Sequence, residues 1–144
     1  MTVKEYLLQL KEADERIRQA YAELSEKRIL AGMVNACSYS EARVKTSGGG
    51  DRTAAAAVSL AGREEELDRL IDDYVSLKRV ITGQIRGMEN RTYSDILYRR
   101  YAEYKSLGQV AKEMDYSYER MRHLHGYALL AFGKAYKIDT QKHI

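Results

Sequence analysis

Residues 106–124 read SLGQVAKEMDYSYERMRHL, and this stretch contains two short helical patterns that meet at a tight turn. Ser106 and Ser117 each stand where a side chain accepts hydrogen bonds from the free amides of a first helical turn, so both are predicted N-caps. The expected core between the two helices is Leu107, Val110, Ala111, Met114, Tyr116, Met121, Leu124 and Ala128. The stretch is therefore predicted to form a helix-turn-helix.

Two residues favour a close crossing of the predicted helices. Ala111 is small, which lets the two backbones approach where a larger side chain would force them apart. Asp115 stands in the turn, where we expect a left-handed backbone, and aspartate tolerates that conformation better than most residues. Both residues fit the predicted turn geometry.

The second predicted helix keeps one face free of the core. That face carries Tyr118, Glu119, Arg122, His123 and Gly126. Arginine binds guanine with two hydrogen bonds, glutamate accepts from cytosine, and tyrosine or histidine reaches phosphates or thymine methyl groups, so the face suits a DNA major groove. The candidate DNA-binding residues are Ser117, Tyr118, Glu119, Arg120, Arg122 and His123, with Arg99, Arg100, Lys105 and Lys112 upstream as expected phosphate contacts.

The charge of the chain is concentrated near the same segment. The formal net charge is +3, and residues 1–92 hold equal numbers of basic and acidic side chains. The whole excess lies in residues 93–144, together with all three histidines and eight of the 12 tyrosines. A basic, aromatic module of this kind favours an anionic partner such as double-stranded DNA.

Two long amphipathic helices are predicted upstream of this module. Apolar residues recur with a helical period from Val3 to Leu30 and again from Leu67 to Met88. A flexible linker is expected at about 38–52, because three successive glycines interrupt the pattern there. The fold class is therefore all-α, with a long antiparallel helical hairpin of coiled-coil type over residues 1–90 and a helix-turn-helix domain over residues 91–144. Two helices alone make a thin core, so we expect the hairpin to form a homodimer or to dock onto the C-terminal module.

Other functional classes find little support in the sequence. His123 and His125 lie on different sides of a helix, and Cys37 is the only cysteine, so neither an enzyme nor a metal or cofactor site is expected. The longest nearly uncharged stretch, Thr53 to Gly62, is far shorter than the ~20 residues that cross a bilayer. The first residues do not form a signal peptide, so we expect a cytoplasmic protein without a membrane partner.

The segment Ser106 to Phe132 resembles the helix-turn-helix of region four of bacterial sigma factors, which reads the promoter −35 element. Residues 118–124, YERMRHL, match the Arg-Glu-Arg-Ile-Arg-Gln-Ile of that recognition helix, and residues 96–101 look like the helix that precedes it. The layout of the whole chain is similar to small phage and prophage proteins that resemble late-gene transcription regulators. Tyr118 stands where sigma factors carry a DNA-contacting arginine, and Gly126 leaves a bare spot, so the resemblance does not imply the −35 sequence preference.

The sequence thus predicts a sequence-specific DNA-binding transcription regulator of phage or prophage type, with its second helix in the major groove. One alternative is a DNA-binding subunit that acts in phage genome packaging. Another is a protein-binding adaptor that contacts RNA polymerase. Strong salt dependence of binding would favour either DNA-binding function over the adaptor, because phosphate contacts release counterions.

Overall fold

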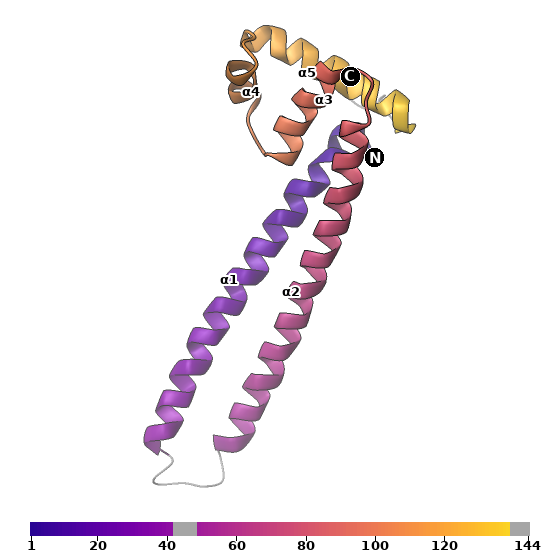
Figure 1. Ribbon diagram of the computed structural model, residues 1–144. Helices are drawn as coiled ribbons and strands as arrows, with labels where there is room; N and C mark the ends of the chain where they lie inside the picture. The colour runs from indigo at the N-terminus through magenta and orange to yellow at the C-terminus, as the bar shows by residue number, and fades with distance from the viewer. Residues whose placement is uncertain (42–48, 139–144) are drawn as a thin grey trace. The chain divides into compact units, whose positions relative to one another are not determined.

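The computed structural model describes the backbone of residues 1–41 and 49–138, and side chains in this range except those of residues 33–53. The described chain is helical, which confirms the predicted all-α class. Its elements are α1 (Val3–Glu41), α2 (Gly49–Arg86), α3 (Arg91–Leu97), the π-helix η1 (Tyr98–Ala102), α4 (Leu107–Glu113) and α5 (Tyr118–Tyr136), as Figure 1 shows. None of the described helices combines the length and apolarity that crossing a bilayer requires.

The linker was predicted at 38–52, but both ends of that range belong to the long helices. The structure assigns residues 38–41 to α1 and residues 49–52 to α2, and residues 42–48 lie outside the described part. Gly49 and Gly50 therefore begin a helix. Glycine is tolerated better at a helix start than in a helix interior, because fewer intrahelical hydrogen bonds depend on it there.

Contacts divide the chain into two compact units. One unit is Glu15–Asp73, and the other combines Met1–Asp14 with Tyr74–Ile144. The sequence predicted a domain boundary at residue 90. The observed division instead falls inside α1, after Asp14, and inside α2, after Asp73. The reason is the packing of Val3, Leu7 and Leu10 of α1 in the same apolar cluster as residues from the C-terminal helices.

Within the unit Glu15–Asp73, α1 and α2 lie side by side and run in opposite directions. Arg63 Nη1 is 3.2 Å from Glu23 Oε2, and Lys27 Nζ donates to Ser59 Oγ at 3.3 Å, so positions that rise along α1 meet positions that fall along α2. Leu24 and Leu67 are the buried apolar residues among the described side chains of this unit. Exposed ion pairs contribute roughly 0.2–1 kcal/mol each. Because few apolar side chains are buried as well, the contact between α1 and α2 in this unit provides little stabilisation.

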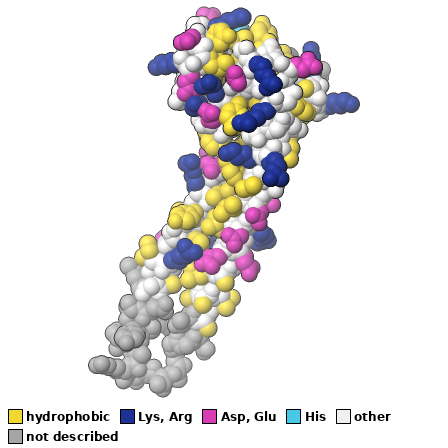
Figure 2. Space-filling model, in the orientation of Figure 1, with side chains coloured by type: hydrophobic (Ala, Val, Ile, Leu, Met, Phe, Trp, Pro, Cys, Tyr) yellow, Lys and Arg dark blue, Asp and Glu magenta, His cyan; other side chains and the backbone are white. Residues whose placement is uncertain are grey.

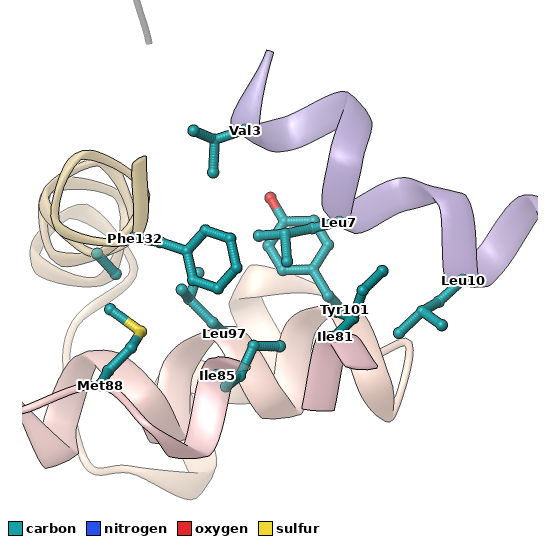
Figure 3. Close-up of a cluster of buried hydrophobic side chains, with 10 residues drawn as sticks. Val3, Leu7, Leu10, Ile81, Ile85, Met88, Leu97, Tyr101 and Phe132 are labelled. Atoms are coloured by element: carbon teal, nitrogen blue, oxygen red, sulfur yellow. The ribbon is translucent and has the colours of Figure 1, made fainter. Parts of the chain in front are cut away.

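The unit formed by Met1–Asp14 and Tyr74–Ile144 has a larger core, shown in Figure 3. Phe132 points from α5 toward side chains of α1, α3 and η1. Its ring centroid lies 6.1 Å from that of Tyr6 and 4.8 Å from that of Tyr136. The buried members are Val3, Leu7, Leu10, Ile81, Ile85, Met88, Leu97, Tyr101, Ala128 and Phe132. One cluster thus ties the first turns of α1 to the last helix.

A second cluster joins α3, α4 and α5. Its buried members are Ile96, Val110, Ala111, Met121 and Leu124, and Leu107 and Met114 pack against it. The prediction that Tyr116 belongs to this core is wrong, because its side chain is 38% exposed. The backbone N–H of Tyr116 closes the turn by donating to the Ala111 carbonyl at 2.9 Å, and Ile96 of α3 fills the core instead.

The local features predicted for the turn are present. Ser106 Oγ accepts from the Gln109 amide at 3.2 Å, and Ser117 Oγ accepts from the Arg120 amide at 3.1 Å, which confirms both N-caps. Asp115 has a φ of 59°, the expected left-handed conformation. Ser117 ends the turn between α4 and α5, and the two capping serines set where α4 and α5 begin.

Replacing Ala111 with leucine is expected to destabilise the unit that contains α4 by about 1–3 kcal/mol. Ala111 is buried between α3, α4 and α5, so a larger side chain must push them apart. Chemical denaturation followed by circular dichroism measures the change. Gln109→Leu is the matched control, because Gln109 is exposed on the same helix. An Ala111→Leu protein with an unchanged unfolding midpoint would show that the helices do not cross closely at this residue.

Candidate nucleic-acid interface

The candidate residues of α5 all lie on its exposed side. Met121, Leu124 and Ala128 bury one stripe of the helix, at helical spacings of three and four residues. The other side presents exposed residues, and Tyr118 is 57% exposed. The exposed candidates are Ser117, Tyr118, Glu119, Arg120, Arg122 and His123. The structure therefore brings this part of the predicted set to one accessible surface.

Gly126 and Ser117 border this surface in different ways. A Cβ atom added at Gly126 would meet nothing within 4 Å, so the position is open space. Ser117 uses one Oγ lone pair for the cap, and its hydroxyl hydrogen can still be donated to an acceptor. Figure 2 shows lysine and arginine side chains spread over the visible face of the C-terminal helices, interspersed with acidic ones.

Two of the four upstream cations are engaged in ion pairs. Arg99 Nη1 lies 2.8 Å from Glu113 Oε2, and Lys105 Nζ lies 2.9 Å from Glu113 Oε1 and 2.6 Å from Glu103 Oε2. Hydrogen bonds from Lys105 and Arg99 lower the pKa of Glu113, and hydrogen bonds to Glu103 and Glu113 raise the pKa of Lys105. A phosphate would have to compete with these carboxylates for Arg99 and Lys105.

The other two upstream cations have different surroundings. Arg100 donates to the Lys105 carbonyl at 3.2 Å, and its guanidinium carbon lies 5.5 Å from the centroid of the Tyr101 ring. Lys112 is exposed on α4. Neither Arg100 nor Lys112 forms an ion pair with a carboxylate in the described ranges 1–41 and 49–138. Lys112 is the more accessible of the two, because Arg100 is half-buried and already donates to the Lys105 carbonyl.

A tyrosine–histidine pair lies beneath this region. Tyr101 Oη and His125 Nε2 are 2.8 Å apart, and the two rings stack with centroids 5.7 Å apart. Burial lowers the pKa of His125 to about 4, and the charges of Arg100 and Lys4 add to this effect. Burial raises the pKa of Tyr101 to about 12, although Arg100 opposes it. His125 is therefore uncharged at neutral pH.

Sequence reasoning did not identify Lys4, Tyr101 or His125 as neighbours. The hydrogen bond joins residues 24 positions apart, and Lys4 is still more distant along the chain. The amphipathic pattern that begins at Val3 indicated that α1 packs against another element, but it did not show which element. These contacts follow from tertiary packing alone.

Other kinds of site are not evident in the described part of the chain. No group of three or more His, Cys, Asp or Glu side chains there could hold a metal ion. The side chain of Cys37 and all of His143 fall outside what the structure describes, so the sequence-based remarks on Cys37 stay predictions.

No protein-family model, curated protein or solved structure matches this chain. The resemblance to sigma region four and to small phage proteins is therefore an expectation that depends on the residues quoted for it. Any functional assignment depends on the residues themselves and on where the fold places them.

Proposed function

We propose that the protein is a sequence-specific DNA-binding transcription regulator of phage or prophage type. In this proposal α4 and α5 form a helix-turn-helix, and the first half of α5 enters the major groove of double-stranded DNA, which admits an α-helix. The observation that carries the proposal is the joint exposure of Tyr118, Glu119, Arg122 and His123 opposite the buried stripe of α5. Each of these side chains can bond to a base edge or a phosphate.

The proposed architecture gives each part of the chain a task. The helices α1 and α2 form a long antiparallel hairpin, and this hairpin positions the DNA-binding helices or joins two copies. A second copy would cover the apolar side chains that remain exposed on the hairpin, such as Tyr21, Ile29 and Val58. We propose no catalytic activity and no cofactor.

Replacing Arg122 with alanine is expected to weaken specific DNA binding by about 1–3 kcal/mol if its guanidinium reads a base. The target duplex is first selected from a random pool, and affinity is then measured by fluorescence anisotropy. Discrimination should relax at one position of the site. Lys112→Ala is the control for a phosphate contact, because it should weaken binding to all duplexes similarly and lower the salt slope by about 1. Equal binding of every duplex by the unmodified protein would refute sequence-specific recognition.

A second candidate function is that of a DNA-binding subunit for phage genome packaging. It is favoured by the small buried contact between α1 and α2 in the unit Glu15–Asp73. Leu24 and Leu67 are its buried apolar residues among those described, while Tyr21, Ile29 and Val58 are exposed, so further copies in a larger oligomer would cover apolar surface. A ring on DNA, observed by native mass spectrometry, would favour packaging, and a bound monomer or dimer would favour transcription. Binding that ignores salt would instead favour an adaptor that contacts RNA polymerase.

A further inference from the structure

Glu113 of α4 bridges two of the candidate phosphate-binding cations. Its carboxylate oxygens lie 2.8 Å from Arg99 Nη1 and 2.9 Å from Lys105 Nζ. Lys105 Nζ also pairs with Glu103 Oε2 at 2.6 Å. The charges of the two basic and two acidic side chains therefore cancel, and a surface that the two cations alone would make positive is locally neutral.

Backbone contacts hold these two cations near each other without the help of Glu113. The backbone N–H of Lys105 donates to the Arg99 carbonyl at 3.1 Å, and the Lys105 carbonyl accepts from the Arg100 side chain at 3.2 Å. The side chains of Arg99 and Lys105 are 36% and 25% exposed, so an anion can reach both from the solvent. The fold thus brings two accessible cations together, and the anion that they hold is the Glu113 carboxylate.

The position of Glu113 in the fold fits a phosphate contact. In a helix-turn-helix bound to DNA, the second helix lies in the major groove while the first helix crosses the phosphate backbone. In the proposed function α4 is that first helix, and Glu113 is its last residue, next to the exposed Lys112. A carboxylate at this place repels phosphates and engages cations that would otherwise attract them.

We propose that Glu113 competes with DNA phosphate for Arg99 and Lys105 and so weakens the binding of every duplex, an inference that rests on the proposed function. A phosphate can accept hydrogen bonds from the guanidinium and the ammonium group, as the Glu113 carboxylate does in the structure. A phosphate that enters must displace this carboxylate or be repelled by it, and both reduce affinity. The contact reads no base, so it does not change which sequence α5 prefers.

Glu113→Gln in the full-length protein is the principal test, because it keeps the size of the side chain and removes its charge. The variant should bind the selected duplex and an unrelated duplex more tightly, by a similar factor. The slope of log affinity against log salt should steepen by about 1, the value expected for one added phosphate contact. Glu89→Gln is the matched control, since Glu89 is exposed between α2 and α3 and its loss changes the net charge equally. The control should leave the slope unchanged.

Double variants show whether the gain depends on the paired cations. Lys105→Gln should reduce the slope more when Glu113→Gln is present than when it is absent, because only then is Lys105 released from Glu113. Lys112→Gln should reduce the slope equally in both backgrounds, since Lys112 does not contribute to the bridge. If melting curves show that Glu113→Gln is unfolded, Glu103→Gln removes the other carboxylate from Lys105 and should steepen the slope in the same direction.

The outcomes separate this inference from the proposed function. If the unmodified protein binds the selected duplex and folded Glu113→Gln binds it no more tightly than Glu89→Gln does, the inference is wrong and the function stands. Weaker binding by folded Glu113→Gln than by the unmodified protein would mean that Glu113 only holds α4 against η1, which also contradicts the inference. If neither the unmodified protein nor Glu113→Gln binds any duplex at any salt concentration, both are wrong.

Discussion

Replacing Phe132 with alanine is expected to lower the free energy of unfolding by about 3–5 kcal/mol, the usual range for losing a buried phenylalanine ring. Phe132 is the only phenylalanine in the chain and is fully buried. Its ring contacts Tyr6 of α1 and Tyr136 of α5, so the cavity would open where helices from both ends of the chain meet. Chemical denaturation measures the loss.

A local measurement makes this expectation specific. Amide hydrogen exchange should accelerate in residues 3–10 of α1 as well as around residue 132, because the two segments share one cluster. Leu130→Ala is the matched control, since Leu130 is 46% exposed on the same helix and its loss should change little. If Phe132→Ala left exchange in residues 3–10 unchanged, the packing of α1 against α5 would be refuted.

Lowering the pH from 7 toward 4 is expected to destabilise the unit that holds His125. Its pKa is about 4 in the folded protein, against 6.5 for an ordinary histidine, so between these values the unfolded chain binds more protons. Stability is therefore fully present above pH 6.5 and falls as the pH drops toward 4. The loss is at most about 3 kcal/mol, and solvent screening of this partly exposed ring reduces it.

Denaturation curves at a series of pH values test this dependence. His125→Gln should flatten the curve between pH 6.5 and 4, and the exposed His123→Gln should leave it unchanged. Loss of the ion pairs of Glu113 occurs at lower pH, since its pKa lies below the ordinary carboxyl value, so the two effects are separable. An unchanged stability over this window in the unmodified protein would mean that the imidazole is hydrated or has an anionic neighbour.

Local chemistry made much of the C-terminal module predictable. The caps at Ser106 and Ser117 and the left-handed Asp115 depend on residues no more than a few positions away, so they can be seen in sequence. Tyr116 was misplaced for the opposite reason. Whether an aromatic side chain in a turn packs inward depends on what else fills the core, and here Ile96 of α3 does so.

The same distinction applies to the candidate interface. Subtracting the apolar stripe of α5 identified its exposed side chains, because helical periodicity alone determines which residues share a face. The partners of Arg99 and Arg100 could not be found this way. Residues 96–101 look like one helix in the sequence, but α3 gives way to the π-helix η1, in which Arg99 pairs with Glu113 while Arg100 lies over Tyr101.

The burial of Val3, Leu7 and Leu10 in one cluster with Tyr101 and Phe132 affects how the chain folds during translation. During translation α1 leaves the ribosome long before α5, so Val3, Leu7 and Leu10 meet Ile81 and Ile85 of α2 earlier than they meet Phe132 of α5. Such distant pairing slows folding, because a long loop must close first. A fragment that begins at residue 91 would lack the side chains that cover Leu97, Tyr101 and Phe132, and we expect it to aggregate when produced alone.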